Sequence, residues 1–238
     1  MAAGFQAWND GNLVQIDGMT PNYQMVRRIT THTQQTSLKY VQNNPGTWYY
    51  TSRWYAQFTF TASNPLYAFV GSGGVGVTPW KFSRNGNTFT AEFIAVSECD
   101  ITLFVWDYAE PTNLGFGLQV FNAQGTLVAD ATTPFCRVIG VVEGTYVDGY
   151  GWRNGGFGMP GANSQSRDYG VPVAFAGAWP AALCGDNVKL AMSAFACSGG
   201  SMTWWLHRYM DDGYWKNFVG FADNAHYRFM VLDMTGII

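Results

Sequence analysis

The stretch GFQAWNDGNLVQID at residues 4–17 returns later in the chain as GLQVFNAQGTLVAD at residues 117–130. Aligned without a gap, the two copies share four residues: Gly4 and Gly117, Gln6 and Gln119, Asn9 and Asn122, and Asp17 and Asp130. Each copy alternates apolar and polar residues, reaches a turn containing Gly11 or Gly125, and continues as an apolar run. Because glycine adopts the positive φ of a tight turn, this pattern predicts a β-hairpin at both places.

Three further short matches follow in both halves of the chain. They are AFVG at 68–71 with AFAG at 174–177, TPW at 78–80 with TWW at 203–205, and LFVWD at 103–107 with FMVLD at 229–233. With the hairpin, the matches keep one order, at offsets of 113, 106, 125 and 126 residues (117−4, 174−68, 203−78 and 231−105). The order favours a tandem duplication in which Trp80 and Trp205 are equivalent. The alternative is chance similarity in a β-rich chain with many glycines and aromatic residues.

Short segments rich in aromatic and β-branched residues, separated by turn signals such as NNPG at 43–46 and NG at 85–86, fill the rest of the chain. Nothing in the sequence has the period of a helix of useful length. Turns recur at the spacing typical of a sandwich or barrel. We therefore predict an all-β chain of two tandem β-sandwich-like modules related by internal duplication. The first module covers 1–111 and the second 112–238, divided at the PTNLG segment.

The second module contains a segment at 149–170, GYGWRNGGFGMPGANSQSRDYG, with no counterpart of its length in the first. Its seven glycines predict a loop without a regular element. Aromatic and arginine side chains on such a loop are typical of binding hot spots. The candidate binding residues are Tyr150, Trp152, Arg153, Arg167 and Tyr169. The alternative is that the loop packs on a neighbouring subunit.

The composition favours assembly with other protein chains. Only 12% of the 238 residues are charged, against 17% aromatic, and the net charge is −3. A surface so poor in charge carries apolar patches, and such patches usually mark contacts with partners. We expect a homo-oligomer, with a trimer as the first choice. The sequence has no basic patch, so we do not expect nucleic-acid binding. No apolar run is long enough for membrane insertion, and the first residues do not resemble a secretory signal.

Residues that carry chemistry are few and scattered. The histidines are His32, His207 and His226, and no nucleophile motif accompanies them. Carboxylates that might form a sugar-cleaving pair are Asp148, Asp168, Asp211 and Asp212, although Asp-Asp-Gly is more simply a turn. The cysteines are Cys99, Cys136, Cys184 and Cys197, without metal-ligand spacing, and buried free thiols are favoured over a Cys184–Cys197 disulfide. We predict no catalytic residue, no metal site and no cofactor.

The hairpin motif resembles the opening of small minor tail proteins of tailed bacteriophages, which begin with a similar G-x-Q-V-F-N stretch, a turn and an apolar segment ending in Asp. The copy at 117–130 is the more similar of the two, and the likeness covers about 14 positions per copy. The resemblance implies a virion component at the tail tip or fibre, assembled in the host cytoplasm and without known catalysis. It also implies other phage tail proteins as partners, and a host surface receptor if the chain contributes to attachment.

The sequence thus predicts a non-enzymatic structural component of a phage tail tip, baseplate or fibre. Two other classes stay open at this point. One is a carbohydrate-binding, lectin-like β-sandwich module outside any virion, and the other is a glycoside hydrolase-like enzyme with a shallow carboxylate site.

Overall fold

The computed structural model describes residues 6–8, 14–17, 22–44, 47–108, 117–146, 164–180, 182–185, 189–210, 218–221 and 226–238. Within these ranges the chain forms β-strands and a single 3-10 turn, η1 (Ser72–Gly74). The strands are β1 (Gln6–Trp8), β2 (Val14–Asp17), β3 (Tyr23–His32), β4 (Gln34–Asn44), β5 (Thr47–Thr61), β6 (Leu66–Gly71), β7 (Val77–Asn85), β8 (Thr88–Ala95), β9 (Asp100–Tyr108), β10 (Gln119–Phe121), β11 (Leu127–Asp130), β12 (Val138–Thr145), β13 (Gln165–Asp168), β14 (Val173–Trp179), β15 (Ala182–Gly185), β16 (Lys189–Ser198), β17 (Ser201–Met210), β18 (Phe218–Phe221) and β19 (His226–Asp233). The predicted all-β class is confirmed.

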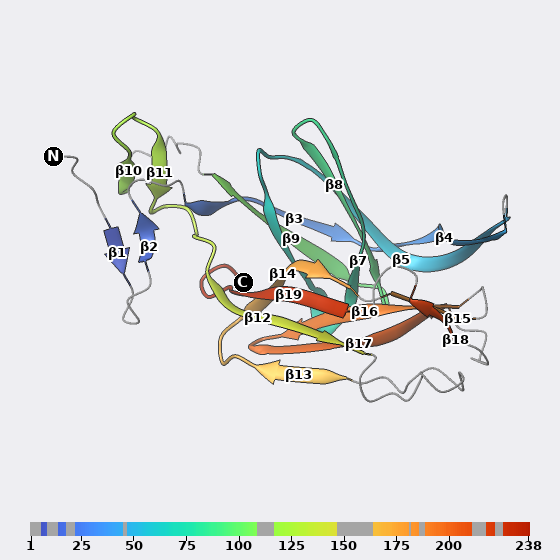
Figure 1. Cartoon of the computed structure of the whole chain (residues 1–238). Helices are drawn as coiled ribbons and strands as arrows, with labels where there is room; N and C mark the ends of the chain where they lie inside the picture. Colours follow the sequence, from blue (N-terminus) through green and yellow to red (C-terminus); the bar gives the residue numbers. More distant parts are fainter. Residues whose placement is uncertain are drawn as a thin grey trace.

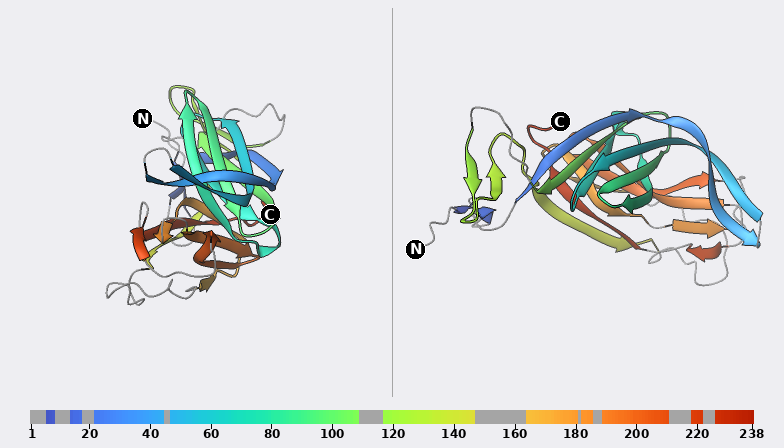
Figure 2. Two further views of the ribbon diagram at one scale, coloured as in Figure 1. Left: turned by 90° about the vertical axis from the view of Figure 1, so that its right-hand side faces the viewer. Right: turned by 90° about the horizontal axis from the view of Figure 1, so that it is seen from above.

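Two large antiparallel sheets form a sandwich (Figure 1). The six-stranded sheet has the order β12-β19-β14-β6-β9-β3. The nine-stranded sheet has the order β13-β17-β16-β7-β8-β5-β4, with β15 paired to β16 and β18 paired to β15. Two separate hairpins, β1-β2 and β10-β11, lie beyond one end of the sandwich, and the β4-β5 hairpin reaches the opposite end (Figures 1 and 2).

Both sheets take strands from both halves of the chain. In the six-stranded sheet, β3, β9 and β6 of the first half meet β14, β19 and β12 of the second, and the central contact is β6 with β14. In the nine-stranded sheet the two halves meet at β7 and β16. The halves therefore lie side by side in a shared sandwich (Figure 2). The predicted boundary near residue 111 lies outside the described residues.

The six-stranded sheet has the same internal order in both halves. An edge strand (β3 or β12) pairs with β9 or β19, which pairs with β6 or β14. The β3-β9 ladder shifts register between Met25 and Arg27, and the β12-β19 ladder shifts between Val138 and Gly140, 113 residues later (138−25). This is the offset of the hairpin motif. A bulge bends and twists a strand, so both edge strands are shaped alike.

One expected equivalence is wrong. Trp80 lies on β7, which pairs with β16 across the contact between the halves. Trp205 lies on β17, which is one strand farther from that contact. The strand that corresponds to β7 is therefore β16. The short TPW and TWW matches have similar residues because both are apolar strand segments, which is too little to fix a position in a sheet.

The main core lies between the two sheets and contains residues from both halves. β5 shows why: strict alternation turns Ala56, Phe58 and Phe60 inward, and each is at most 5% exposed. Phe69 on β6 and Phe175 on β14 are directly paired across the halves, with ring centroids 6.0 Å apart. The two sequence matches AFVG and AFAG thus form the centre of the six-stranded sheet.

The outer face of the six-stranded sheet is also apolar, and the last residues of the chain cover part of it. Leu232 and Trp106 on this face are buried together with Met234 and Ile237. The Met234 amide donates to the Pro172 carbonyl (2.8 Å). No helix in the described ranges is long and apolar enough to cross a membrane.

In the first half, the chain passes from one sheet to the other at Thr33. Thr33 is buried, exchanges hydrogen bonds with Cys99, and connects β3 of one sheet to β4 of the other. In the second half, β13 lies in the nine-stranded sheet and pairs with β17. The predicted loop at 149–170 therefore contains a strand at Gln165–Asp168, because pairing with β17 satisfies its backbone despite the glycines nearby.

Candidate functional site

The repeated hairpin motif is a hydrogen-bonded unit. In the β10-β11 hairpin, Gln119 lies opposite Asp130, and its Nε2 donates to Asp130 Oδ2 (2.9 Å). Oδ1 of the same carboxylate accepts from the Thr132 amide (2.9 Å) and hydroxyl (2.6 Å). Asp130 is fully buried, so each of these bonds stabilises a carboxylate that water cannot reach. The shared Gln and Asp of the motif are thus cross-strand partners.

The shared asparagine of the second copy, together with a glycine, forms the turn. Asn122 Oδ1 accepts from the amides of Gln124 (3.0 Å) and Thr126 (2.8 Å), and Gly125 has a φ of 78°. An asparagine side chain that accepts from nearby amides is a frequent way to close a turn. The bulge in this hairpin lies between Val120 and Phe121.

A second set of bonds attaches the hairpin to the sandwich. Gln24, buried at the start of β3, accepts from the Asp130 amide (2.7 Å) and donates to the carbonyl oxygens of Asp130 and Thr133. The Asn22 amide donates to the Val128 carbonyl (2.9 Å). We call the Gln24–Asp130–Gln119 group the hairpin latch. It joins the first half of the chain to the hairpin of the second.

The first hairpin has the same register as the second. Gln6 pairs with Asp17, Ala7 with Ile16, and Trp8 with Val14, each 113 residues before its counterpart in β10-β11. The match also continues past the hairpins, since Thr20-Pro21 corresponds to Thr133-Pro134 at the same offset (133−20). The 113-residue offset thus holds from the hairpins to the bulges of β3 and β12, and the repeated Thr-Pro dipeptide is the sequence signal that reveals it.

The predicted binding residues divide into two groups. Tyr150, Trp152 and Arg153 lie outside the described residues. Arg167 is exposed on β13, with its guanidinium carbon 5.1 Å from the centre of the Tyr169 ring. The Tyr169 amide donates to the Gly200 carbonyl (2.9 Å), and the side chain packs against the main core. Contrary to the expectation of a flexible glycine loop, Arg167 and Tyr169 are held by a strand and by packing.

The carboxylates considered for sugar cleavage do not form a described pair. Asp168 accepts from the Gly170 amide (3.0 Å) and so closes a turn. Asp148, Asp211 and Asp212 lie outside the described ranges. Among the residues that the structure describes, no group of three or more His, Cys, Asp or Glu is arranged to hold a metal ion.

The described thiols are free. Cys99 and Cys197 are buried and Cys136 is half-buried. Burial raises the pKa of the Cys99 and Cys136 thiols to about 11, and it raises the pKa of Cys197 as well. Protonated thiols are poor nucleophiles, so none of the three is suited to covalent chemistry near neutral pH.

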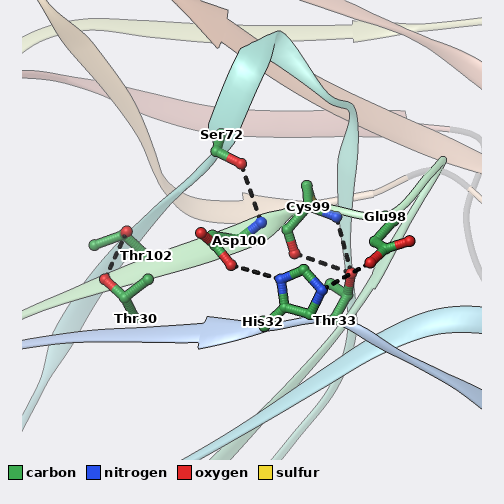
Figure 3. Close-up of polar contacts among 8 residues, drawn as sticks. All are labelled: Thr30, His32, Thr33, Ser72, Glu98, Cys99, Asp100 and Thr102. Carbon is green, nitrogen blue, oxygen red and sulfur yellow. Dashed lines mark hydrogen bonds and ion pairs between the residues drawn. The ribbon is translucent and has the colours of Figure 1, made fainter.

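An exposed polar cluster lies where β3 ends and β9 begins, beside η1 (Figure 3). His32 contacts Asp100 through Nδ1 (2.7 Å) and Glu98 through Nε2 (2.9 Å). The Asp100 amide donates to Ser72 Oγ (3.0 Å). The hydrogen bonds to Asp100 and then Glu98 raise the pKa of His32, because a doubly donating imidazolium fits between two carboxylates. The side chains of the cluster bond to one another, and the hydrogen bond from the Asp100 amide to Ser72 links β9 to η1.

His207 lies in the opposite electrostatic environment. It lines a cavity of about 210 Å³ with Gln35, Ser52 and Arg53 between β4, β5 and β17. Burial, and to a lesser degree the Arg53 charge, lowers its pKa to about 4. His207 is thus a neutral imidazole at physiological pH.

The lowered pKa of His207 predicts that the fold loses stability in acid. The folded-state pKa of His207 is below its unfolded value of 6.5, so its contribution to stability is complete above pH 6.5 and is lost as pH falls toward 4. We expect a loss of about 2 kcal/mol over this range, after allowing for partial solvent screening. Urea unfolding at pH 7, 5.5 and 4.5 measures it, and His207→Gln should flatten the wild-type pH dependence.

His32→Gln is the matched control for this experiment. Because the pKa of His32 is raised, its contribution is present below pH 6.5 and is lost as pH rises through the folded-state value. The two variants should therefore change the pH dependence in opposite directions. An unchanged acid slope in His207→Gln would show that other groups cause the acid sensitivity.

Comparisons of the chain with models of protein families, with curated protein sequences and with solved structures find no match.

Proposed function

We propose that the chain is a non-enzymatic structural component of a bacteriophage tail tip, baseplate or fibre, built from two copies of one β module. The repeated hairpin motif carries this proposal, since it resembles minor tail proteins and occurs twice in one register. The equal bulge positions in β3 and β12 support the duplication. The contribution to host attachment is part of the same proposal.

Exposed apolar side chains support a role in assembly. Leu118 and Phe121 on the β10-β11 hairpin are 57% and 49% exposed. Val138, Ile139 and Val141 lie on β12, an edge strand of the six-stranded sheet, and are 43–50% exposed. A hairpin beyond the end of the sandwich and an apolar edge strand are surfaces that bind further protein chains. Other tail proteins and further copies of this chain are the proposed partners.

Particle composition tests the proposal. In a phage or prophage system that encodes the chain, we expect the protein to co-purify with gradient-purified particles and to fractionate with detached tails. Deletion of its gene should yield particles with incomplete tails or without infectivity. Normal, infective particles that lack the protein would contradict the proposed role.

We also expect a homo-oligomer, with a trimer as the first choice, at micromolar concentration. Burying an apolar surface of several hundred Å² contributes a gross free energy on the order of 10 kcal/mol before association costs. Light scattering after size-exclusion chromatography measures the state. Val138→Lys with Val141→Lys should weaken association if β12 is the contact, whereas Thr88→Lys, at the exposed first residue of β8, should not. A wild-type monomer at these concentrations would refute the prediction.

A carbohydrate-binding module is the second candidate function. One observation favours it, which is an open pocket with a polar rim where β12 and β19 meet beside β14.

A further inference from the structure

The two halves of the chain contact each other through equivalent residues. At the centre of the six-stranded sheet, Phe69 pairs antiparallel with Phe175, its counterpart in the repeated AFVG and AFAG segments. Beside the hairpins, the Cys136 amide donates to the Tyr23 carbonyl (2.9 Å), and these two residues are also counterparts, 113 positions apart (136−23). Contacts of a residue with its own counterpart mark a twofold relation, in which every other contact is expected twice.

The contact of β11 with the start of β3 is one that should occur twice. The Asn22 amide donates to the Val128 carbonyl (2.9 Å), and the Gln24 side chain bonds to the backbone amide and carbonyl of Asp130. Gln24 has no exposed surface, and all four residues of β11 are buried. The counterpart of β11 is β2, in the same hairpin register. A β2 strand is therefore expected against the second-half equivalents of Asn22 and Gln24.

Those equivalents line an open pocket. They are Phe135 and Arg137 (135−22 and 137−24 are both 113). We call the space beside them the docking pocket, which has a volume of about 370 Å³ and is lined by residues 131–135, Arg137 and residues 235–237. The Arg137 side chain is 38% exposed, whereas Gln24 has no exposed surface. In the described part of the chain, the place that β11 covers in the first half is thus uncovered in the second.

The docking pocket offers donors to the backbone of a strand. Arg137 donates through Nη2 to the Thr235 carbonyl (2.5 Å), and its Nη1 lies 3.5 Å from Asp233 Oδ2. A guanidinium has five N–H donors in one plane, so donors remain for a further carbonyl group. Gln24 uses its amide in this way, since its Nε2 donates to the carbonyl oxygens at the end of β11. Arg137 can therefore hold β2 as Gln24 holds β11.

The charge at this position also complements the first hairpin. Asp130 of the second hairpin accepts from the Thr132 hydroxyl, but the first hairpin has Met19 at the position equivalent to Thr132. Asp17, the equivalent of Asp130, therefore has one side-chain donor fewer in its own hairpin. A positive charge at Arg137 in place of the neutral Gln24 compensates for this loss, because a carboxylate that becomes buried needs donors or a cation.

The apolar surface continues along β12 beyond the docking pocket. Val138, Ile139 and Val141 are 48%, 43% and 50% exposed. The first half has Arg28 at the position of Val141, and Arg28 is exposed and donates to the Ile237 carbonyl (3.1 Å). A hairpin alone covers the pocket and leaves Val141 in water, whereas a second sandwich that arrives with the hairpin covers both. We propose that the docking pocket binds the β1-β2 hairpin of a second copy of this chain.

Exchange of the hairpin is a low-cost route to an oligomer, because the same contact already exists inside the chain between β11 and β3. β1 and β2 form a sheet of their own beyond the end of the sandwich (Figure 1), where a neighbouring copy can reach them. Each copy supplies a hairpin and a pocket, so a ring of copies fills every pocket. This inference deepens the proposed function by naming the contact of the expected homo-oligomer, and it does not depend on the virion role.

Two variants of the full-length chain test the exchange. Val14→Lys with Ile16→Lys changes the hairpin at the equivalents of the buried Leu127 and Ala129. Phe135→Glu changes the docking pocket. Each should raise the dissociation constant of the oligomer at least about tenfold, measured by light scattering across a dilution series. The control is Ala123→Lys with Gln124→Lys in the exposed turn of the second hairpin, which should leave association unchanged.

Mixing the two variants is the decisive step. The hairpin variant retains an intact pocket and the pocket variant retains an intact hairpin, so an equimolar mixture should form a heterodimer that neither variant forms alone. Native mass spectrometry identifies it, since the two chains differ in mass. Thermal unfolding checks that both variants fold. If Phe135→Glu unfolds early, Ala131→Glu at the exposed rim of the docking pocket takes its place.

Three results would overturn the proposal, and they differ in what else they remove. An oligomer that both variants leave intact refutes the exchange and keeps the homo-oligomer. Weakened variants whose mixture forms no heterodimer refute the exchange in the same way. A wild-type monomer, in which the hairpin variant lowers only the stability of the fold, means that each hairpin docks on its own chain, and it removes the homo-oligomer as well. None of these results affects the particle-composition test.

Discussion

Replacing Phe175 with alanine is expected to lower the free energy of unfolding by about 3–5 kcal/mol, because a large buried ring leaves a cavity that the surroundings fill only in part. Phe175 has no exposed surface. Its ring centroid lies 5.0 Å from those of both Phe195 and Phe229, and its strand pairs with β6 of the first half. The cavity would therefore open where the two halves of the chain meet.

Urea unfolding followed by fluorescence and circular dichroism measures this effect. Phe121→Ala is the control, since Phe121 is 49% exposed on the β10-β11 hairpin and its loss should cost under about 1 kcal/mol. Because the main core mixes residues of both halves, wild type and variant should each unfold in one transition. Two separate transitions in the wild type, with Phe175→Ala affecting one, would mean that the halves unfold independently.

Replacing Asp130 with alanine is expected to cost about 2–4 kcal/mol, since it removes a buried acceptor and leaves donors unsatisfied. Its carboxylate accepts from Gln119 Nε2 and from the amide and hydroxyl of Thr132. The same residue is bound through its backbone to Gln24 of β3. Loss of the carboxylate should therefore weaken both the hairpin and its attachment to the sandwich.

Hydrogen exchange together with urea unfolding separates these effects. In Asp130→Ala, amides of β10 and β11 should exchange much faster, while amides of β9 keep most of their protection. Asp168→Ala is the matched control, because Asp168 accepts from an amide two residues later as Asp130 does, but is exposed. Its cost should stay below about 1 kcal/mol. Equal costs in the two variants would show that burial of the latch contributes nothing.

The sequence predicts the local elements because their causes are local. In the repeated motif, Gln119 and Asp130 are partners across a hairpin, and Asn122 and Gly125 form its turn. All of these residues lie within a dozen positions of one another. Alternation along a strand is equally local, and it predicts the inward side chains of β5 such as Phe58.

The candidate sites are a harder problem, as two particular regions show. The glycine-rich segment at 149–170 predicts a loop, but Arg167 lies on a strand because the backbone of this strand pairs with β17. The pocket rim joins β12 with β19, strands whose paired residues Thr145 and His226 are 81 positions apart (226−145). Neither spacing nor composition marks such a pair, because neither residue type is unusual in a strand.

What the sequence by itself determines here is the all-β class, the two hairpins and the turn of the β10-β11 hairpin, since turn chemistry and alternation act between near neighbours. The tertiary structure decides that the halves share two sheets, and that β7 corresponds to β16 and so separates Trp80 from Trp205. The physical reason is that strand pairing satisfies any backbone, whatever its side chains. The choice among partners is made by which arrangement buries the apolar faces of the whole chain together.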